Sequence, residues 1–192
     1  MFLGGVMMAT GNQPPATVPA KGVYSAGDIE RNSVFFGYPV LSTPSNFFTE
    51  VAKSILQVQR IIVAAQLQGE NIEPLISAFT DAIHSDKKKR DDRNELHIND
   101  KFLSACCLEA GFDSDALILA SKQEHAKGVL KENTEEAVRM GVFGSPSFVV
   151  FGAREEYGGP SPFLIFGSDR FDLLAEALGI EWSGPNPSLS KL

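Results

Sequence analysis

The fold is decided by one stretch near the C-terminus, GVFGSPSFVVFGAREEYGGPSPFLIFGSDRFDLLAEALG (Gly141–Gly179). Ser147–Phe151 and Phe163–Phe166 are short apolar runs flanked by proline and glycine, which is the pattern of buried strands. Residues 153–162 between them carry charges, a Gly-Gly pair and two prolines. The chain must therefore turn there, and the two flanking runs are expected to pair antiparallel as a hairpin with a long tip.

A helix is expected directly after this hairpin. Apolar residues recur at helical spacing up to Gly179, and Ser168 or Asp169 is the expected N-cap. The start of a helix presents amide N–H groups and a partial positive charge, which suit a carboxylate, whereas Asp169 suits an ammonium group. These few residues predict a pocket for an amino-acid zwitterion. A plain helix cap is the structural alternative.

A proline turn precedes the first strand and carries a family resemblance. Gly144-Ser145-Pro146 is a candidate cis peptide turn. Together with Phe166-Gly167-Ser168-Asp169-Arg170, it resembles the kappa class of glutathione transferases, in which a Gly-x-Pro turn and FGSDR flank the last strands. The resemblance implies that the Ser145 backbone pairs with the cysteinyl residue of glutathione beside Pro146, and that Ser168 and Asp169 hold the γ-glutamyl end. The residue before the proline is commonly leucine in that family and is serine here.

The N-terminal segment extends the resemblance. Met1–Met8 is interpreted as the end of a strand, and the prolines in Thr10–Pro15 predict an extended loop, followed by a helix over residues 24–31 with Ser25 as its cap. The run resembles the kappa-class loop with an SGN or TGN tripeptide, two prolines and Lys-Gly-x-Tyr. That implies a glutathione contact for Asn12 and a place at the ligand's edge for Lys21. The alternative is that Asn12 only closes a turn.

The middle of the chain reads as a helical block. Helices are expected from about Ser45 to Gly69 and over 71–85, from an Asn99 cap to Gly111, and from Ser114, while Asn133 either caps a new helix or continues the previous one.

The predicted fold is α/β: an N-terminally truncated thioredoxin-like domain (1–44 and 132–192) with an inserted α-helical domain (45–131). The kappa transferases, the bacterial disulfide oxidoreductases and the glutathione-dependent 2-hydroxychromene-2-carboxylate isomerases share this arrangement. Cys106 and Cys107 are adjacent and form no CxxC pair, which argues against the oxidoreductases.

Composition excludes several classes of function. The 192 residues are 43% apolar, carry a net charge of −7 and have a pI near 5.0, so nucleic acid is not an expected partner. The run DKKKRDDRN (86–94) mixes both signs and predicts a solvated loop. No apolar run approaches the roughly 18 residues of a membrane span, and the N-terminus lacks the charged start of a secretory signal. The histidines at 84, 97 and 125 match no metal spacing, so no metal site is expected.

The last three residues, Ser190, Lys191 and Leu192, spell the peroxisomal import address. They predict the peroxisome as the location and its import receptor as a partner, and the sequence leaves a second location in mitochondria open.

One element of the kappa pattern has no counterpart. In the family, the first strand leads into a helix that starts with a Ser-Pro-Tyr-Ser-like motif, whose serine hydroxyl donates a hydrogen bond to the glutathione sulfur. Met1 is expected to align with the second strand, so the first strand, the first helix and this serine are lacking, and no catalytic residue is assigned. Ser145-Pro146-Ser147 is no substitute, because it is the later proline turn.

The resemblance implies a homodimeric glutathione transferase that conjugates glutathione, as co-substrate, to small electrophiles and has possible peroxidase activity, with no other cofactor. The alternatives are a non-catalytic glutathione-binding or dimerising protein, or an isomerase of the 2-hydroxychromene-2-carboxylate type.

Overall fold

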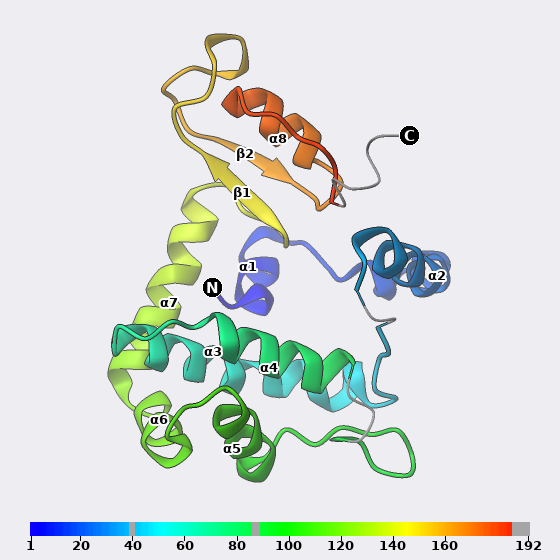
Figure 1. The fold of residues 1–192 in the computed structure, drawn as a ribbon, viewed down its shortest axis with the longest axis vertical. Coiled ribbons are helices and arrows are strands. Elements are labelled where there is room, and N and C mark those ends of the chain that lie inside the picture. Colours follow the sequence, from blue (N-terminus) through cyan, green and yellow to red (C-terminus); the bar gives the residue numbers. More distant parts are fainter. Residues whose placement is uncertain (39–40, 86–88, 186–192) are drawn as a thin grey trace. The chain divides into compact units, whose positions relative to one another are not determined.

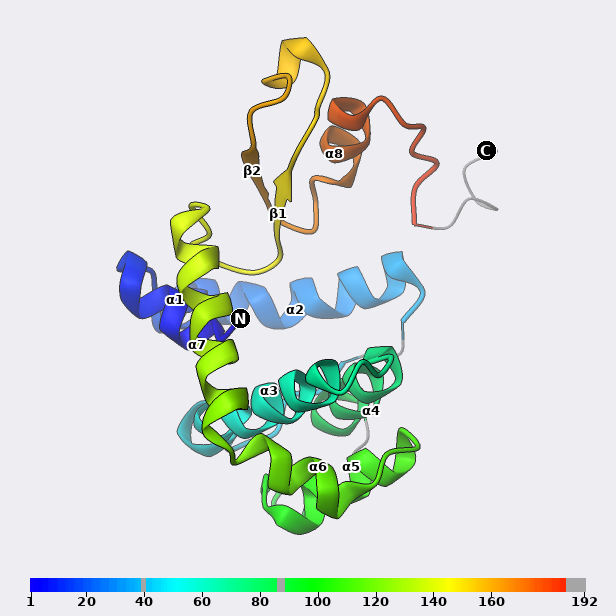
Figure 2. The same ribbon diagram turned by 90° about the vertical axis from the view of Figure 1, so that its left-hand side faces the viewer.

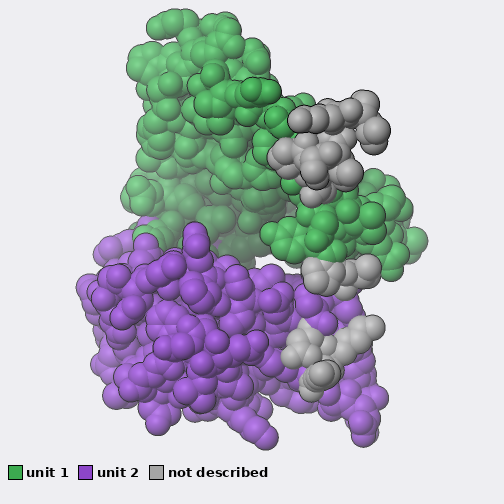
Figure 3. All heavy atoms as spheres, viewed as in Figure 1, with its two compact units in different colours: residues 1, 3–38, 133–192 green, residues 2, 39–132 purple. Residues whose placement is uncertain are grey.

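The computed structural model describes residues 1–38, 41–85 and 89–185. The predicted import address at 190–192 lies outside these ranges. The chain divides into two compact units (Figure 3), the first formed by residues 1, 3–38 and 133–192 and the second by residues 2 and 39–132. The domain bounds predicted from the sequence stay a prediction. In the part of the chain that the structure describes, every helix is too short or too polar to span a bilayer.

The hairpin of the first unit is confirmed. Strand β1 (Ser147–Val150) pairs antiparallel with β2 (Phe163–Phe166), with Ser147 opposite Phe166 and Val150 opposite Phe163. Among the described residues these two strands form the whole sheet. The connection between them contains a 3-10 turn, Glu155–Tyr157.

Helix α8 (Phe171–Leu178) lies beside this hairpin in both views (Figures 1 and 2). The Phe171 ring meets the ring of Phe148 on β1 edge-on, with 5.5 Å between centroids. At the other end of the helix, the amide of Arg154 donates to the carbonyl of Ala177 at 2.9 Å. A two-stranded hairpin is marginal by itself, so α8 supplies the apolar cover that stabilises it. The helix ends at Gly179 in the left-handed conformation, as predicted.

The expected N-terminal strand is wrong, because Leu3–Thr10 forms helix α1. Its leucine, methionine and alanine residues are good helix formers, and the two glycines at positions 4 and 5 do not prevent the helix. The hydroxyl of Thr10 donates back to the carbonyl of Val6 at 2.9 Å, and Gly11 takes φ 71° where the helix ends.

The helix expected over 24–31 is longer than predicted and starts earlier. Helix α2 spans Pro19–Phe36, with proline in its first turn, where the missing N–H group costs nothing. Ser25 is therefore no cap, and its hydroxyl donates to the carbonyl of Lys21 at 2.7 Å. Lys21 lies on this helix and not in a loop.

The described part of the second unit is a helical bundle. Helix α3 (Ala52–Leu67), which follows a π-helical turn at Phe47–Val51, contacts α4 (Glu73–His84) and α6 (Ser114–Ser121), and α5 (Asp100–Glu109) contacts α4 and α6. These contacts enclose an apolar core whose largest fully buried side chains are Val51, Ile61, Leu75, Leu96, Leu103, Cys106, Cys107 and Leu117. Most of the buried apolar surface of the described chain lies here, so this unit carries most of the hydrophobic stabilisation.

Three helix boundaries between residues 99 and 139 can be compared with those predicted. The side chain of Asn99 accepts from the amide of Phe102 at 3.0 Å, which confirms the predicted cap of α5. Helix α6 begins at Ser114, as predicted, and the side chain of Asp113 caps it by accepting from the amide of Ala116 at 3.1 Å. Asn133 lies inside α7 (Glu124–Arg139), so the continuous helix is the correct alternative.

Candidate functional site

The antiparallel register brings the two predicted glutathione turns to the same end of the hairpin. Ser147 pairs with Phe166, so Pro146 and Gly167 are the next residues on the two strands. The amide of Gly167 donates to the carbonyl of Pro146 at 3.1 Å, and the Ser145–Pro146 bond is cis, as predicted. Residues 145–146 and 168–169 are thereby joined, although more than twenty positions separate them in the sequence.

Asn12 is tied to the same place. Its Nδ2 donates to the carbonyl of Phe143 at 2.7 Å, and its Oδ1 accepts from the amide of Gln13 at 2.8 Å. The neighbouring Gly144 is buried, and a Cβ there would lie 2.8 Å from Cε2 of Phe166. The glycine lets the proline turn approach the end of β2 closely, and Asn12 holds the turn from the other side.

Ser168 and Asp169 do not cap α8, which corrects the prediction. The N-cap position is Arg170, and its side chain makes no capping bond. Gly167 has φ 109°, and the carboxylate of Asp169 folds back against it. Neither side chain caps the helix, and the ligand contacts predicted for them stay predictions. Asp169 is paired with the guanidinium of Arg170 at 2.9 Å, and both groups are exposed.

The first helical turn of α8 supplies backbone amide groups beside Ser168 and Asp169. The first helical hydrogen bond runs from the amide of Leu174 to the carbonyl of Arg170, and the amide of Leu173 is met by the carboxylate of Asp172. The amides of Phe171 and Asp172 precede that first bond, so they carry the partial positive charge of a helix start. Whether these amides bind the carboxylate of a zwitterion stays a prediction.

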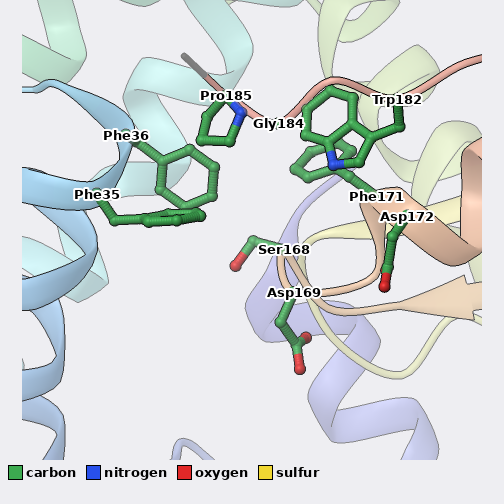
Figure 4. A pocket seen from close by; sticks show the side chains of 9 residues that line it. All are labelled: Phe35, Phe36, Ser168, Asp169, Phe171, Asp172, Trp182, Gly184 and Pro185. Carbon is green, nitrogen blue, oxygen red and sulfur yellow. The ribbon is translucent and has the colours of Figure 1, made fainter. Parts of the chain in front are cut away.

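Ser168 and Asp169 open into a hollow of about 300 Å³ with aromatic walls (Figure 4). The Phe171 ring stacks on Trp182 with 5.4 Å between centroids. On the α2 side, Phe35 and Phe36 meet edge-on at 5.0 Å. The remaining lining residues are Asp172, Gly184 and Pro185. Aromatic rings from two segments therefore line the hollow, together with the polar side chains of Ser168, Asp169 and Asp172.

Sequence reasoning missed these aromatic residues. Trp182 is the only tryptophan of the chain, and Phe35-Phe36 is an adjacent pair at the end of a helix, which is the signal that could have found them. Lys21, the remaining predicted contact, is exposed in the first turn of α2 and is not one of the residues that line the hollow.

Three side chains that could act as nucleophiles, Ser147, Cys106 and Cys107, have structural roles instead. The hydroxyl of Ser147 donates to the carbonyl of Gly144 at 2.8 Å and so stabilises the proline turn. Cys106 and Cys107 are buried in the second unit, and burial, followed by the charge of Cys106, raises the pKa of the Cys107 thiol to about 11. That thiol stays protonated near neutral pH and is a poor nucleophile.

Comparisons with known proteins agree with this geometry. Residues 1–179 match the family described as the DSBA-like thioredoxin domain. Glutathione S-transferase kappa 1 of Rattus norvegicus is 34% identical over 189 residues, which cover 97% of this chain and 78% of the rat protein. The enzyme of the same name from Homo sapiens is 30% identical over 191 residues, with the same coverage.

A solved structure of 2-hydroxychromene-2-carboxylate isomerase superposes with a TM-score of 0.64 over 92% of this chain and 76% of that chain, at 19% identity, and this likeness establishes the shared fold. The thioredoxin-like fold and the family resemblance predicted from the sequence are confirmed. The chain belongs to the DSBA-like thioredoxin family and, within it, to the kappa class of glutathione S-transferases.

Proposed function

We propose that the protein is a glutathione transferase that binds glutathione at the end of the hairpin and conjugates it to small electrophiles. The observation that carries the proposal is the hydrogen bond between Gly167 and Pro146, which joins the proline turn to the Ser168–Asp169 turn. The two kappa 1 relatives, aligned over almost the whole chain, support the same activity.

Two of the three residues of glutathione have matching groups. The α-ammonium of the γ-glutamyl residue meets the Asp169 carboxylate, and its α-carboxylate meets the Ser168 hydroxyl and the first amides of α8. The cysteinyl backbone pairs with the main chain at Ser145, beside Pro146. Binding requires Asp169 to leave Arg170, and this costs little because exposed ion pairs contribute only about 0–1 kcal/mol.

Conjugation also requires the thiolate, since a thiol with a pKa near 8.5 is mostly protonated at neutral pH. A hydrogen-bond donor at the sulfur lowers that pKa. The hydroxyl of Ser147 is engaged with Gly144, and this contact favours a second candidate function, in which the chain binds glutathione without activating it.

A paired assay separates the two candidates. Retention on immobilised glutathione reports binding, and turnover of a chloronitrobenzene substrate reports conjugation. We expect retention together with turnover above the uncatalysed rate. Retention without turnover would assign the binding function, and the absence of both would refute the site. Consumption of a lipid hydroperoxide or of 2-hydroxychromene-2-carboxylate, measured in parallel, tests the peroxidase and isomerase activities.

We also propose that the protein is a homodimer and reaches the peroxisome through Ser190–Leu192. Light scattering of the purified chain tests the first proposal, with a monomer mass as the contrary result. For the second, imaging of a fluorescent fusion that keeps Leu192 at its free C-terminus should show peroxisomes, and removal of the last three residues should disperse the signal. Mitochondrial staining of the intact fusion would identify the second location.

A further inference from the structure

A histidine and two carboxylates converge in the second unit, in the loop between α4 and α5. The ligand atoms of Asp91, Glu95 and His97 all lie within 4.8 Å of one another. Nε2 of His97 is 3.6 Å from Oδ2 of Asp91 and 3.9 Å from Oε2 of Glu95. Two ligands at about 2.0–2.1 Å from one tetrahedral zinc ion lie about 3.3 Å apart, so small side-chain rotations bring these atoms onto a common ion.

The other nitrogen of His97 is held from a different element. Nδ1 lies 3.0 Å from Oε1 of Glu50, which belongs to the π-helical turn before α3. With Nδ1 donating to this carboxylate, Nε2 is the nitrogen left to bind an ion beside Asp91 and Glu95, and it gives up its proton when the ion binds. A carboxylate behind a histidine is the usual support of a metal-bound imidazole.

The Glu50 carboxylate is itself held by a buried side chain. Asn46, which is only 7% exposed, donates from Nδ2 to Oε2 of Glu50 at 3.0 Å. The same side chain exchanges two hydrogen bonds of 3.0 Å with the backbone of Leu96, which is fully buried. Glu50 and the residue before His97 are thus fixed by one buried amide.

The Asp91 carboxylate is also oriented. Its Oδ1 accepts the amides of Arg93 and Glu95, each at 2.9 Å, so Oδ2 is the oxygen left for His97 or an ion. Two carboxylates and one imidazole favour Zn²⁺ over Mg²⁺ or Ca²⁺, which prefer oxygen ligands alone. Asp91 and His97 are 41% and 47% exposed at their side chains, so an ion can enter from solvent and keep water as its fourth ligand.

We propose that Asp91, Glu95 and His97 form a zinc site, with Glu50 as the residue that orients His97. This differs from the expectation that the three histidines are unrelated to metal, because that expectation considered only the spacing of the histidines and not the carboxylates of Asp91 and Glu95 in the same loop as His97. A bound ion links the 91–97 loop to the turn that carries Glu50.

Titration calorimetry of the chelator-treated full chain with zinc chloride tests the proposal, and magnesium chloride serves as the comparison ion. We expect one zinc ion per chain and at least tenfold weaker binding of magnesium. H97Q and E95Q should each weaken zinc binding at least tenfold, and E50Q should weaken it about tenfold through loss of orientation.

The matched control is H125Q, which removes an exposed histidine at the start of α7 and should leave zinc affinity unchanged. Circular dichroism of each variant verifies its fold, and E95Q serves if H97Q is unfolded. The proposal is overturned if zinc binding does not saturate below about 100 μM, or if folded E95Q binds zinc as tightly as the unmodified chain.

Discussion

Substitution of Gly167 by alanine is the sharpest structural test of the glutathione site. At φ 109° a side chain is strained, and the new Cβ would also run into the carboxylate of Asp169. Backbone strain outside the common regions costs about 1–3 kcal/mol, and displacement of Asp169 adds to it, so we expect G167A to lose about 3 kcal/mol. G152A is the matched control, because Gly152 also has positive φ, 66°, but a Cβ there meets nothing within 4 Å. It should lose about 1 kcal/mol.

Urea unfolding followed by tryptophan fluorescence measures this difference. Trp182 is the only tryptophan, and it stacks on Phe171 in the first unit, so its emission reports on the part of the chain that holds the site. With an m-value of about 2 kcal/mol/M, the midpoints of G167A and G152A should fall by about 1.5 M and about 0.5 M.

Glutathione affinity provides the second readout. The Kd of G167A should rise at least tenfold, because Asp169 is displaced, whereas that of G152A should not change. Equal midpoints for the two variants, or an unchanged Kd for folded G167A, would refute this reasoning.

The remaining predictions concern stability. N99A should cost about 1 kcal/mol in urea unfolding followed by circular dichroism, because it removes the cap of α5, whereas N133A, inside α7, should cost nothing; an equal loss in both would contradict these boundaries. F171A should cost about 2 kcal/mol and shift the Trp182 emission, since it removes the ring that joins α8 to β1, and an unaltered spectrum would count against that packing. Burial and, to a lesser degree, Arg90 lower the pKa of His84 from 6.5, so the unfolded chain binds this proton more tightly. The His84 contribution to the free energy of unfolding is therefore fully present above about pH 6.5 and is lost as the pH falls below it, so the unmodified chain should lose stability relative to H84N below this pH, and an identical pH profile for H84N would be the contrary result.

The sequence predicted the C-terminal part of the fold well because its signals are local. Pro146 and Gly152 bound one apolar run, Gly179 ends the last helix, and Asn99 caps another, so each boundary follows from a side chain and its neighbours. The N-terminal helix was missed for the opposite reason. The two glycines and the apolar residues of Met1–Met8 fit a strand end as well as a helix, and nothing local decides between them.

The family resemblance assigned the Ser145–Pro146 and Ser168–Asp169 turns to one glutathione molecule, whereas local patterns could not show that the turns are neighbours. The pairing of Ser147 with Phe166 is what brings them together in the structure. Phe35 and Trp182 could each have been singled out from the sequence, but they lie far apart in the chain, and only the folded structure brings them to one hollow.

The most direct test of the account is calorimetric titration with glutathione and with an analogue that lacks only the γ-glutamyl ammonium group. The unmodified chain should bind glutathione at least tenfold more tightly than the analogue, and D169N should bind both with the same weakened affinity, while D115N, altered at an exposed aspartate of α6, keeps the preference. If D169N retains the full preference for the ammonium group, the assignment of the site is contradicted.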